Sequence, residues 1–92
     1  MNAYVTVDLT VKNAEKLSEY GSQAPDTFIE FGGEFIAKGA IEALHGEAVF
    51  TTKVIIRFPD KAKAVGWYNS KAYQEIIPTR DEAFDSQFHL VD

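Results

Sequence analysis

Apolar and polar positions alternate along the first part of the chain. From position 3 to position 12, even-numbered positions hold residues with a polar group and odd-numbered positions hold aliphatic ones: Ala3, Val5, Val7, Leu9 and Val11. A period of two that is rich in β-branched residues predicts a strand with one buried face. Shorter stretches of the same kind predict strands over residues 52–58 and 86–91, and a further strand is expected over residues 34–38, after Gly32-Gly33.

The segment 39–46 fits two structures. It places Ile41-Glu42-Ala43-Leu44 between Gly39 and Gly46. These residues can extend the second strand past a bulge, or they can form a short helical turn. We favour the bulged strand, with Gly46 beginning the connection to the next strand.

A different spacing predicts the first helix. Between positions 14 and 31, apolar residues recur in steps of three and four and form one stripe: Leu17, Tyr20, Ala24, Phe28 and Phe31. Asn13 is a suitable N-cap. Gly32-Gly33 is expected to end the helix, because glycine tolerates a left-handed C-cap. We expect an interruption, with the helix resuming after Gly21 or starting again near Pro25.

A second helical region follows the third strand. Pro59 is expected to end that strand, since it cannot donate to a ladder, and Asp60 to cap the helix. Ser70 is a second N-cap candidate, so we expect the helix to break at Asn69 and restart. Pro78 is expected to stop it.

The resulting order of elements is β-α-β-β-α-β. It is typical of the ferredoxin-like fold, an α+β arrangement in which two helices cover one face of a four-stranded antiparallel sheet. Because a small core with an uncovered sheet face needs a cover, we expect a homodimer. We also expect Asp8 and Arg57 to face each other across the sheet, and we favour an ion pair of that interface over a catalytic pair. The uncovered face is predicted to carry a mixed set of side chains: Tyr4, Thr6, Asp8, Thr10, Lys53, Ile55, Arg57 and His89.

Composition narrows the class of protein. The chain has 92 residues, so residues 1–92 are predicted to form a single domain. Nine basic and 14 acidic residues give a net charge of −5, and the basic residues are scattered, which argues against nucleic acid or an anionic membrane as a partner. No window is apolar enough for a membrane span, no secretory-signal pattern is present and there are no cysteines, so we expect a cytoplasmic protein.

An ordered series of motifs runs along essentially the whole chain. They are Tyr4-Val5-Thr6-Val7, Tyr20, Pro25, Phe31-Gly32-Gly33-Glu34-Phe35-Ile36-Ala37-Lys38-Gly39, Gly46, Phe58-Pro59, Ala64, Trp67-Tyr68, Ser70, Tyr73-Gln74, Pro78 and Arg80. On these residues the chain resembles the domain-of-unknown-function family 1330, one of the dimeric α/β-barrel families.

The resemblance implies a ferredoxin-like protomer whose sheet packs against that of a partner to close a barrel. Related families on this scaffold include cofactor-independent monooxygenases, haem-degrading enzymes and small-ligand-binding regulatory domains. The family has no established general reaction, so the resemblance transfers fold more securely than function. Family members often have Arg where this chain has Lys38 and Gly where it has Ala40. An arginine can bind a carboxylate through two parallel hydrogen bonds, whereas a lysine binds it as a point charge and less specifically.

Three aromatic residues near the second helical region are candidates for a pocket. Trp67, Tyr68 and Tyr73 can wall a ligand site, or they can pack in the core with a satisfied polar tip. Packing is favoured for Tyr68. Trp67 suits both interpretations equally and is a candidate ligand-binding residue. Tyr73 is the best pocket candidate and a candidate catalytic residue.

Two cations and one histidine complete the candidate site. Arg80 can bind a substrate carboxylate, or it can tie the last helix to nearby acceptors. Lys38 is either an anion ligand or an ordinary exposed strand residue. His45 is a candidate general base at a loop mouth, although a lone loop histidine is more often simply exposed. No metal-ligand spacing and no phosphate-loop motif occurs, so no metal or cofactor is expected.

Three functional classes remain open. The first is a cofactor-independent enzyme that acts on a small aromatic or carboxylate-bearing molecule. The second is a dimeric module that binds a small ligand without turnover. The third is an accessory protein whose barrel is purely structural.

Overall fold

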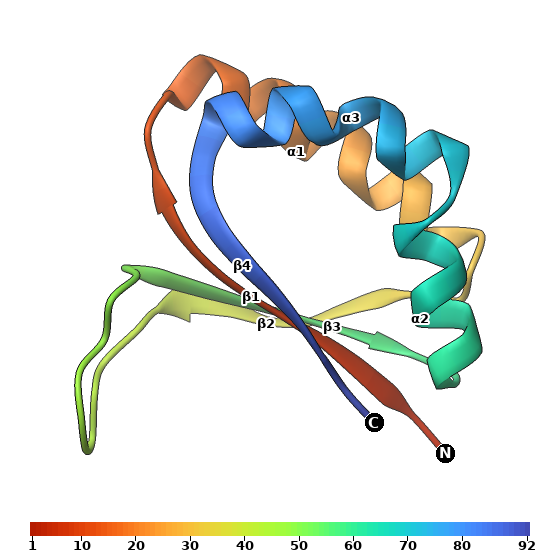
Figure 1. The fold of residues 1–92 in the computed structure, drawn as a ribbon, viewed down its shortest axis with the longest axis horizontal. Helices are drawn as coiled ribbons and strands as arrows, with labels where there is room; N and C mark the ends of the chain where they lie inside the picture. The colour runs from red at the N-terminus through yellow and green to blue at the C-terminus, as the bar shows by residue number, and fades with distance from the viewer.

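Four strands form one antiparallel sheet in the order β2-β3-β1-β4 (Figure 1). The computed structural model describes residues 1–92, and its strands are β1 (Ala3–Val11), β2 (Glu34–Ala40), β3 (Thr52–Phe58) and β4 (Phe84–Val91). The central strand β1 pairs with β3 on one side and with β4 on the other. Its odd-numbered positions from 3 to 9 are buried, so the alternation predicted from the sequence is confirmed.

The helices all cover the same face of the sheet (Figure 1). They are α1 (Ala14–Ile29), α2 (Lys61–Tyr68) and α3 (Lys71–Ala83). The core lies between them and the sheet, where Phe58, Trp67 and Tyr73 are the largest fully buried side chains. The ferredoxin-like fold is therefore confirmed, with the second helical region divided in two.

Local capping explains where the helices begin. The side chains of Asn13, Asp60 and Ser70 accept hydrogen bonds from the backbone N–H groups three residues further on, which the first turn of a helix leaves unpaired. The predicted break at Asn69 and restart at Ser70 are confirmed.

Both prolines that were expected to interrupt or end a helix lie inside one. α1 runs without interruption through Gly21 and Pro25, and α3 continues past Pro78 to Ala83. A proline removes one backbone hydrogen bond. Most helical stability in proteins comes from packing of an apolar face, and both helices bury one against the sheet. Arg80 consequently lies in the last turn of α3 and not after its end.

The connection after β2 also departs from the prediction. β2 ends at Ala40, and residues 41–51 form bends instead of a bulged strand. The bulge lies earlier, between Phe35 and Ala37. Figure 1 shows residues 41–51 as a long arm that projects from the sheet, away from the helices.

The face of the sheet opposite the helices is uncovered, as predicted. On β1 and β3 it carries the residues expected there, with Thr6 between Ile55 and His89. The predicted pair of Asp8 and Arg57 is wrong. In the observed register Asp8 lies opposite Lys53, whose Nζ is 3.2 Å from Asp8 Oδ1, and Arg57 pairs with Glu34.

Candidate functional site

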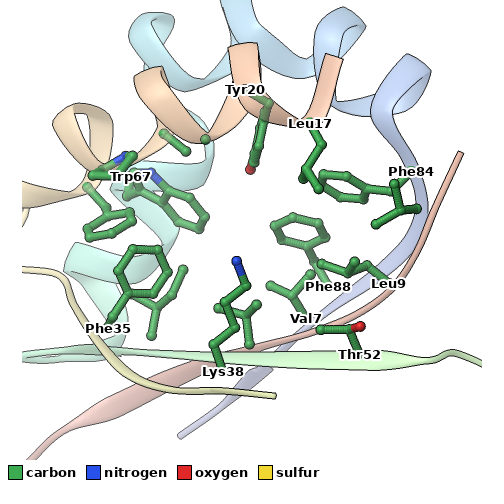
Figure 2. A pocket seen from close by; sticks show the side chains of 17 residues that line it. Val7, Leu9, Leu17, Tyr20, Phe35, Lys38, Thr52, Trp67, Phe84 and Phe88 are labelled. Carbon is green, nitrogen blue, oxygen red and sulfur yellow. The ribbon is translucent and has the colours of Figure 1, made fainter. Parts of the chain in front are cut away.

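A cavity of about 190 Å³ lies between α1 and the covered face of the sheet (Figure 2). Thirteen of its 17 lining residues are hydrophobic. The lining comprises Val7, Leu9, Val11, Leu17, Tyr20, Gly21, Ala24, Pro25, Phe28, Phe35, Lys38, Thr52, Val54, Ile56, Trp67, Phe84 and Phe88.

The cavity follows from the patterns that build the fold. The strands contribute side chains from their buried face, and α1 contributes the residues of its apolar stripe. Two of the α1 residues, Gly21 and Ala24, are small. A Cβ added at Gly21 would meet no atom within 4 Å. Space therefore remains where a larger pair of side chains would have filled the gap between helix and sheet.

The bulge in β2 directs Lys38 to this cavity. Phe35 pairs with Ile56, and Lys38 pairs with Val54, so both lie opposite buried residues of β3. In a regular strand, residues three positions apart would point to opposite faces. The extra residue at the bulge places both on the helix-covered face. Figure 2 shows the Lys38 ammonium pointing into the cavity.

Lys38 is the only charged residue of the lining. It forms no ion pair with any carboxylate of the chain. The tip of Tyr20 enters the cavity from α1, on the side opposite Lys38 (Figure 2). The lining contains four polar side-chain groups. They are the Lys38 ammonium, the hydroxyls of Tyr20 and Thr52, and the buried indole N–H of Trp67.

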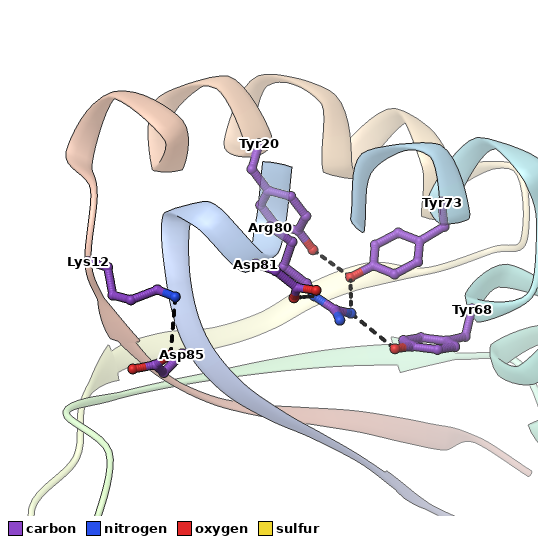
Figure 3. Close-up of polar contacts among 7 residues, drawn as sticks. All are labelled: Lys12, Tyr20, Tyr68, Tyr73, Arg80, Asp81 and Asp85. Carbon is purple, nitrogen blue, oxygen red and sulfur yellow. Dashed lines mark hydrogen bonds and ion pairs between the residues drawn. The ribbon is translucent and has the colours of Figure 1, made fainter. Parts of the chain in front are cut away.

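A cluster of three tyrosines and one arginine adjoins the cavity (Figure 3). Tyr20 Oη lies 2.8 Å from Tyr73 Oη. Arg80 Nη1 donates to Tyr68 Oη at 3.0 Å and to Tyr73 Oη at 3.4 Å, and Arg80 Nε donates to Asp81 at 3.0 Å. The guanidinium also lies 4.8 Å from the ring centroid of Phe88, a cavity-lining residue. The cluster therefore joins α1, α2 and α3 directly behind the pocket wall.

The cluster keeps the phenols of Tyr20 and Tyr73 neutral and its arginine charged. Burial raises the pKa of Tyr20, and the neighbouring Tyr73 raises it further. Burial also raises the pKa of Tyr73, against smaller opposing contributions from its hydrogen bonds. Burial acts to lower the pKa of Arg80, but its hydrogen bonds to Tyr68 and Tyr73 contribute to a net rise. At neutral pH both phenols therefore retain their protons next to a guanidinium cation.

The structure places the predicted site residues in three different environments. Lys38 and Trp67 line the cavity. The Trp67 side chain is also fully buried, and its Nε1 donates to Thr27 Oγ1 at 2.9 Å, so the indole donor is already used within the protein. Tyr73 and Arg80 belong to the cluster behind the wall and do not line the cavity. His45 lies exposed on the 41–51 arm, outside the cavity lining.

Sequence reasoning did not select Tyr20 as a site residue. Tyr20 was assigned to the apolar stripe of the first helix and to the motifs of the family resemblance, and neither gave it a role in a site. The available signal was its hydroxyl, which interrupts an otherwise apolar face and requires a hydrogen-bonding partner once it is buried.

No group of three or more His, Asp or Glu side chains is arranged to hold a metal ion. None of the three helices has the length and apolar character needed to cross a bilayer.

Solved structures share this fold. The RPA0582 protein of unknown function from Rhodopseudomonas palustris is 20% identical, with a TM-score of 0.80 over 98% of this chain and 80% of that one. A dimeric ferredoxin-like protein of unknown function from Jannaschia sp. is 14% identical, with a TM-score of 0.75 over 100% and 99% of the two chains. SnoaB, a cofactor-independent oxygenase from Streptomyces nogalater, is 12% identical, with a TM-score of 0.69 over 99% and 91%.

At these identities the likeness establishes the fold alone. The comparison with curated proteins gives no match. The model of the family described as "Domain of unknown function (DUF1330)" matches residues 2–92, and the chain therefore belongs to that family.

Proposed function

We propose that this protein binds a small, largely apolar organic molecule in the cavity between α1 and the sheet. The observation that carries the proposal is the cavity itself, about 190 Å³ in volume and lined mainly by hydrophobic side chains. An apolar cavity of about 150 Å³ is large enough to accept a benzene molecule. The cavity of this protein therefore suits one aromatic ring with a short substituent.

Ethylbenzene is a suitable probe of this proposal. We expect titration of the ¹⁵N-labelled protein to shift amide signals of α1, β2 and β3. The variant Ala24→Leu places a larger side chain in the cavity and should weaken this binding about tenfold or more, since it removes space that the ring needs. Gln23→Leu is the matched control, because position 23 is exposed on the same helix and outside the lining.

Two results would contradict binding in this cavity. One is the absence of any shift in the unaltered protein at saturating concentrations of ethylbenzene and of its polar analogues of the same size. The other is an unchanged affinity in the Ala24→Leu variant, provided that its circular dichroism and melting temperature show a folded protein.

A second candidate function is turnover of the bound molecule without a cofactor. The similarity in fold to SnoaB and the hydrogen-bonded cluster behind the pocket wall favour it. In this candidate Tyr73 would act only through Tyr20, since Tyr73 itself is fully buried. His45 would require a change in the position of the arm to reach the cavity.

Native mass spectrometry of the purified protein distinguishes binding from turnover. Any molecule that copurifies would be identified and returned to the protein under ¹⁸O₂. A product that carries ¹⁸O would support cofactor-independent oxygenation. Recovery of the unchanged molecule would favour the binding module.

We also propose a homodimer in which the uncovered faces of two sheets pack together. Two kinds of observation support this assembly. The uncovered face carries the half-buried side chains of Tyr4, Thr6 and Ile55. Solved structures of similar fold from Jannaschia sp. and Thermobifida fusca are described as dimeric.

A further inference from the structure

We propose that the ligand of this cavity is an organic acid, whose anionic oxygen lies between the Lys38 ammonium and the Tyr20 hydroxyl. The inference rests on the proposed binding function and deepens it, because it assigns the charge of the ligand. It follows from the direction of the hydrogen bonds behind the pocket and from the absence of a counter-charge within it.

The direction of the hydrogen bonds begins at Arg80. A guanidinium group has donors and no acceptor, so Tyr68 Oη and Tyr73 Oη both accept from it. Tyr73 is fully buried, and its only other hydroxyl contact is Tyr20 Oη at 2.8 Å. If Tyr20 donated to Tyr73, the proton of Tyr73 would have no acceptor, and a buried unpaired donor costs free energy. Tyr73 therefore donates to Tyr20.

This direction leaves the Tyr20 proton free for a ligand. The Tyr20 oxygen accepts from Tyr73, and the O–H of Tyr20 itself then has no acceptor within the chain. The hydroxyl enters the cavity, as Figure 2 shows. A hydrogen bond received from a polarised donor strengthens the donor that follows it in a chain. Tyr20 is thus a directed donor, and Tyr73 and Arg80 are positioning residues that orient it.

Lys38 adds a second donor that carries a full charge. It reaches the cavity from β2, on the side opposite Tyr20, and no carboxylate of the chain neutralises it (Figure 2). A cationic ligand would be repelled by this ammonium group. A neutral hydrocarbon would offer an acceptor to neither donor, although the exposed Lys38 side chain would still reach water. An anionic oxygen satisfies both of them, and charge-assisted hydrogen bonds are the stronger kind.

Cavity size limits the rest of the ligand. With about 190 Å³ and an apolar lining, the cavity holds one ring and one short acidic arm. Its single charged residue matches one negative charge. The class is therefore a one-ring monocarboxylic acid or an acid of similar size and charge.

Three probes of similar size separate charge from shape. Phenylacetate carries the anionic oxygens, 2-phenylacetamide is its neutral counterpart, and ethylbenzene has no polar group. At pH 7 we expect the unaltered protein to bind phenylacetate about tenfold or more tightly than 2-phenylacetamide, since one charge-assisted contact corresponds to at least that factor. Calorimetric or NMR titration would measure the three affinities.

Variants assign the preference to the two donors. Lys38→Met keeps the length of the side chain and removes its charge, and should abolish the preference for phenylacetate over the amide. Lys63→Met is the matched control, because Lys63 is exposed on α2 and forms no ion pair, and it should leave the preference intact. Tyr20→Phe should weaken phenylacetate binding and leave ethylbenzene binding unchanged, which a merely structural defect would not do.

The outcomes distinguish this inference from the proposed function. If ethylbenzene binds in the cavity and phenylacetate binds no more tightly than the amide, the inference is overturned and the proposed function stands. If Lys38→Met retains the preference for the acid, the assignment to Lys38 is overturned. If none of the three probes binds to the unaltered protein, the proposed function and the inference fail together.

Discussion

Two glycines show how single residues act in opposite ways on this fold. Gly32 follows α1 and has a φ of +77°, a left-handed conformation that side chains disfavour. A Cβ added at this position would lie 2.7 Å from Pro59 Cγ. Gly21 lies inside α1, where no such requirement exists and a Cβ would meet no atom within 4 Å.

The same substitution is therefore expected to have opposite effects at these two positions. Gly32→Ala should lower the free energy of unfolding by about 1–2 kcal/mol, from the left-handed backbone alone. Gly21→Ala should raise the free energy of unfolding by about 0.5–1 kcal/mol, because alanine favours a helix interior. Urea denaturation of both variants would measure the difference. Equal effects of the same sign would contradict this account.

At the scale of elements, the contact between Tyr20 and Tyr73 joins α1 to α3. Their hydroxyl groups lie 2.8 Å apart, and burial raises the pKa of both. In the unfolded chain each phenol titrates near pH 10. The folded state therefore retains protons that the unfolded state loses above this pH. The contribution of the two phenols to the free energy of unfolding is fully present below about pH 10 and falls as the pH rises further.

Alkaline unfolding tests this contact. We expect the unaltered protein to lose free energy of unfolding between about pH 10 and 11.5. The double variant Tyr20→Phe, Tyr73→Phe should lose less over the same range, because it lacks the two groups whose pKa burial raises. Urea titrations at several pH values would give the two slopes. Equal slopes would mean that these phenols do not control the alkaline response.

Elements defined by neighbouring residues could be predicted, whereas the site depends on distant ones. The caps at Asn13, Asp60 and Ser70 each act within one helical turn, so the sequence indicates them directly. The position of Lys38 depends on a bulge that is defined by pairing with β3. The role of Tyr20 depends on the packing of α1 against α3. A pattern of neighbouring residues shows neither the pairing of β2 with β3 nor the packing of α1 against α3.

Proline is the clearest case in which packing outweighs a local rule. Pro25 and Pro78 were expected to interrupt or stop helices, yet α1 and α3 each continue beyond them. Both helices bury residues on either side of the proline: Ala24 and Phe28 in α1, and Ile76 and Ala83 in α3. The local rule describes an isolated helix and does not include this burial.

At the scale of the whole molecule, the uncovered sheet face is exposed to water in a monomer and buried in the proposed dimer. Ile55 lies in this face, between Thr6 on β1 and Ala37 on β2. In an isolated protomer a glutamate at this position would face water. In a dimer closed by this face it would be a buried, unpaired charge, which is costly.

Ile55→Glu should therefore convert a dimer to a monomer without unfolding it. Sedimentation velocity should give twice the chain mass for the unaltered protein and the single chain mass for this variant. Ala62→Glu is the control, because position 62 is exposed on α2, and it should remain dimeric. A dimeric Ile55→Glu variant would assign the interface to another surface.

The bulged strand β2 also has a consequence for amide hydrogen exchange. In the protomer β2 is an edge strand that pairs only with β3, its ladder is irregular between Phe35 and Ala37, and all seven of its residues are exposed. Such a strand opens locally at a lower cost than the central β1. Lys38 therefore lies on the wall that opens most readily, and Tyr20 lies on a wall secured by α3. We therefore expect an occupied cavity to slow amide exchange most strongly along β2, which contributes Phe35 and Lys38 to the lining.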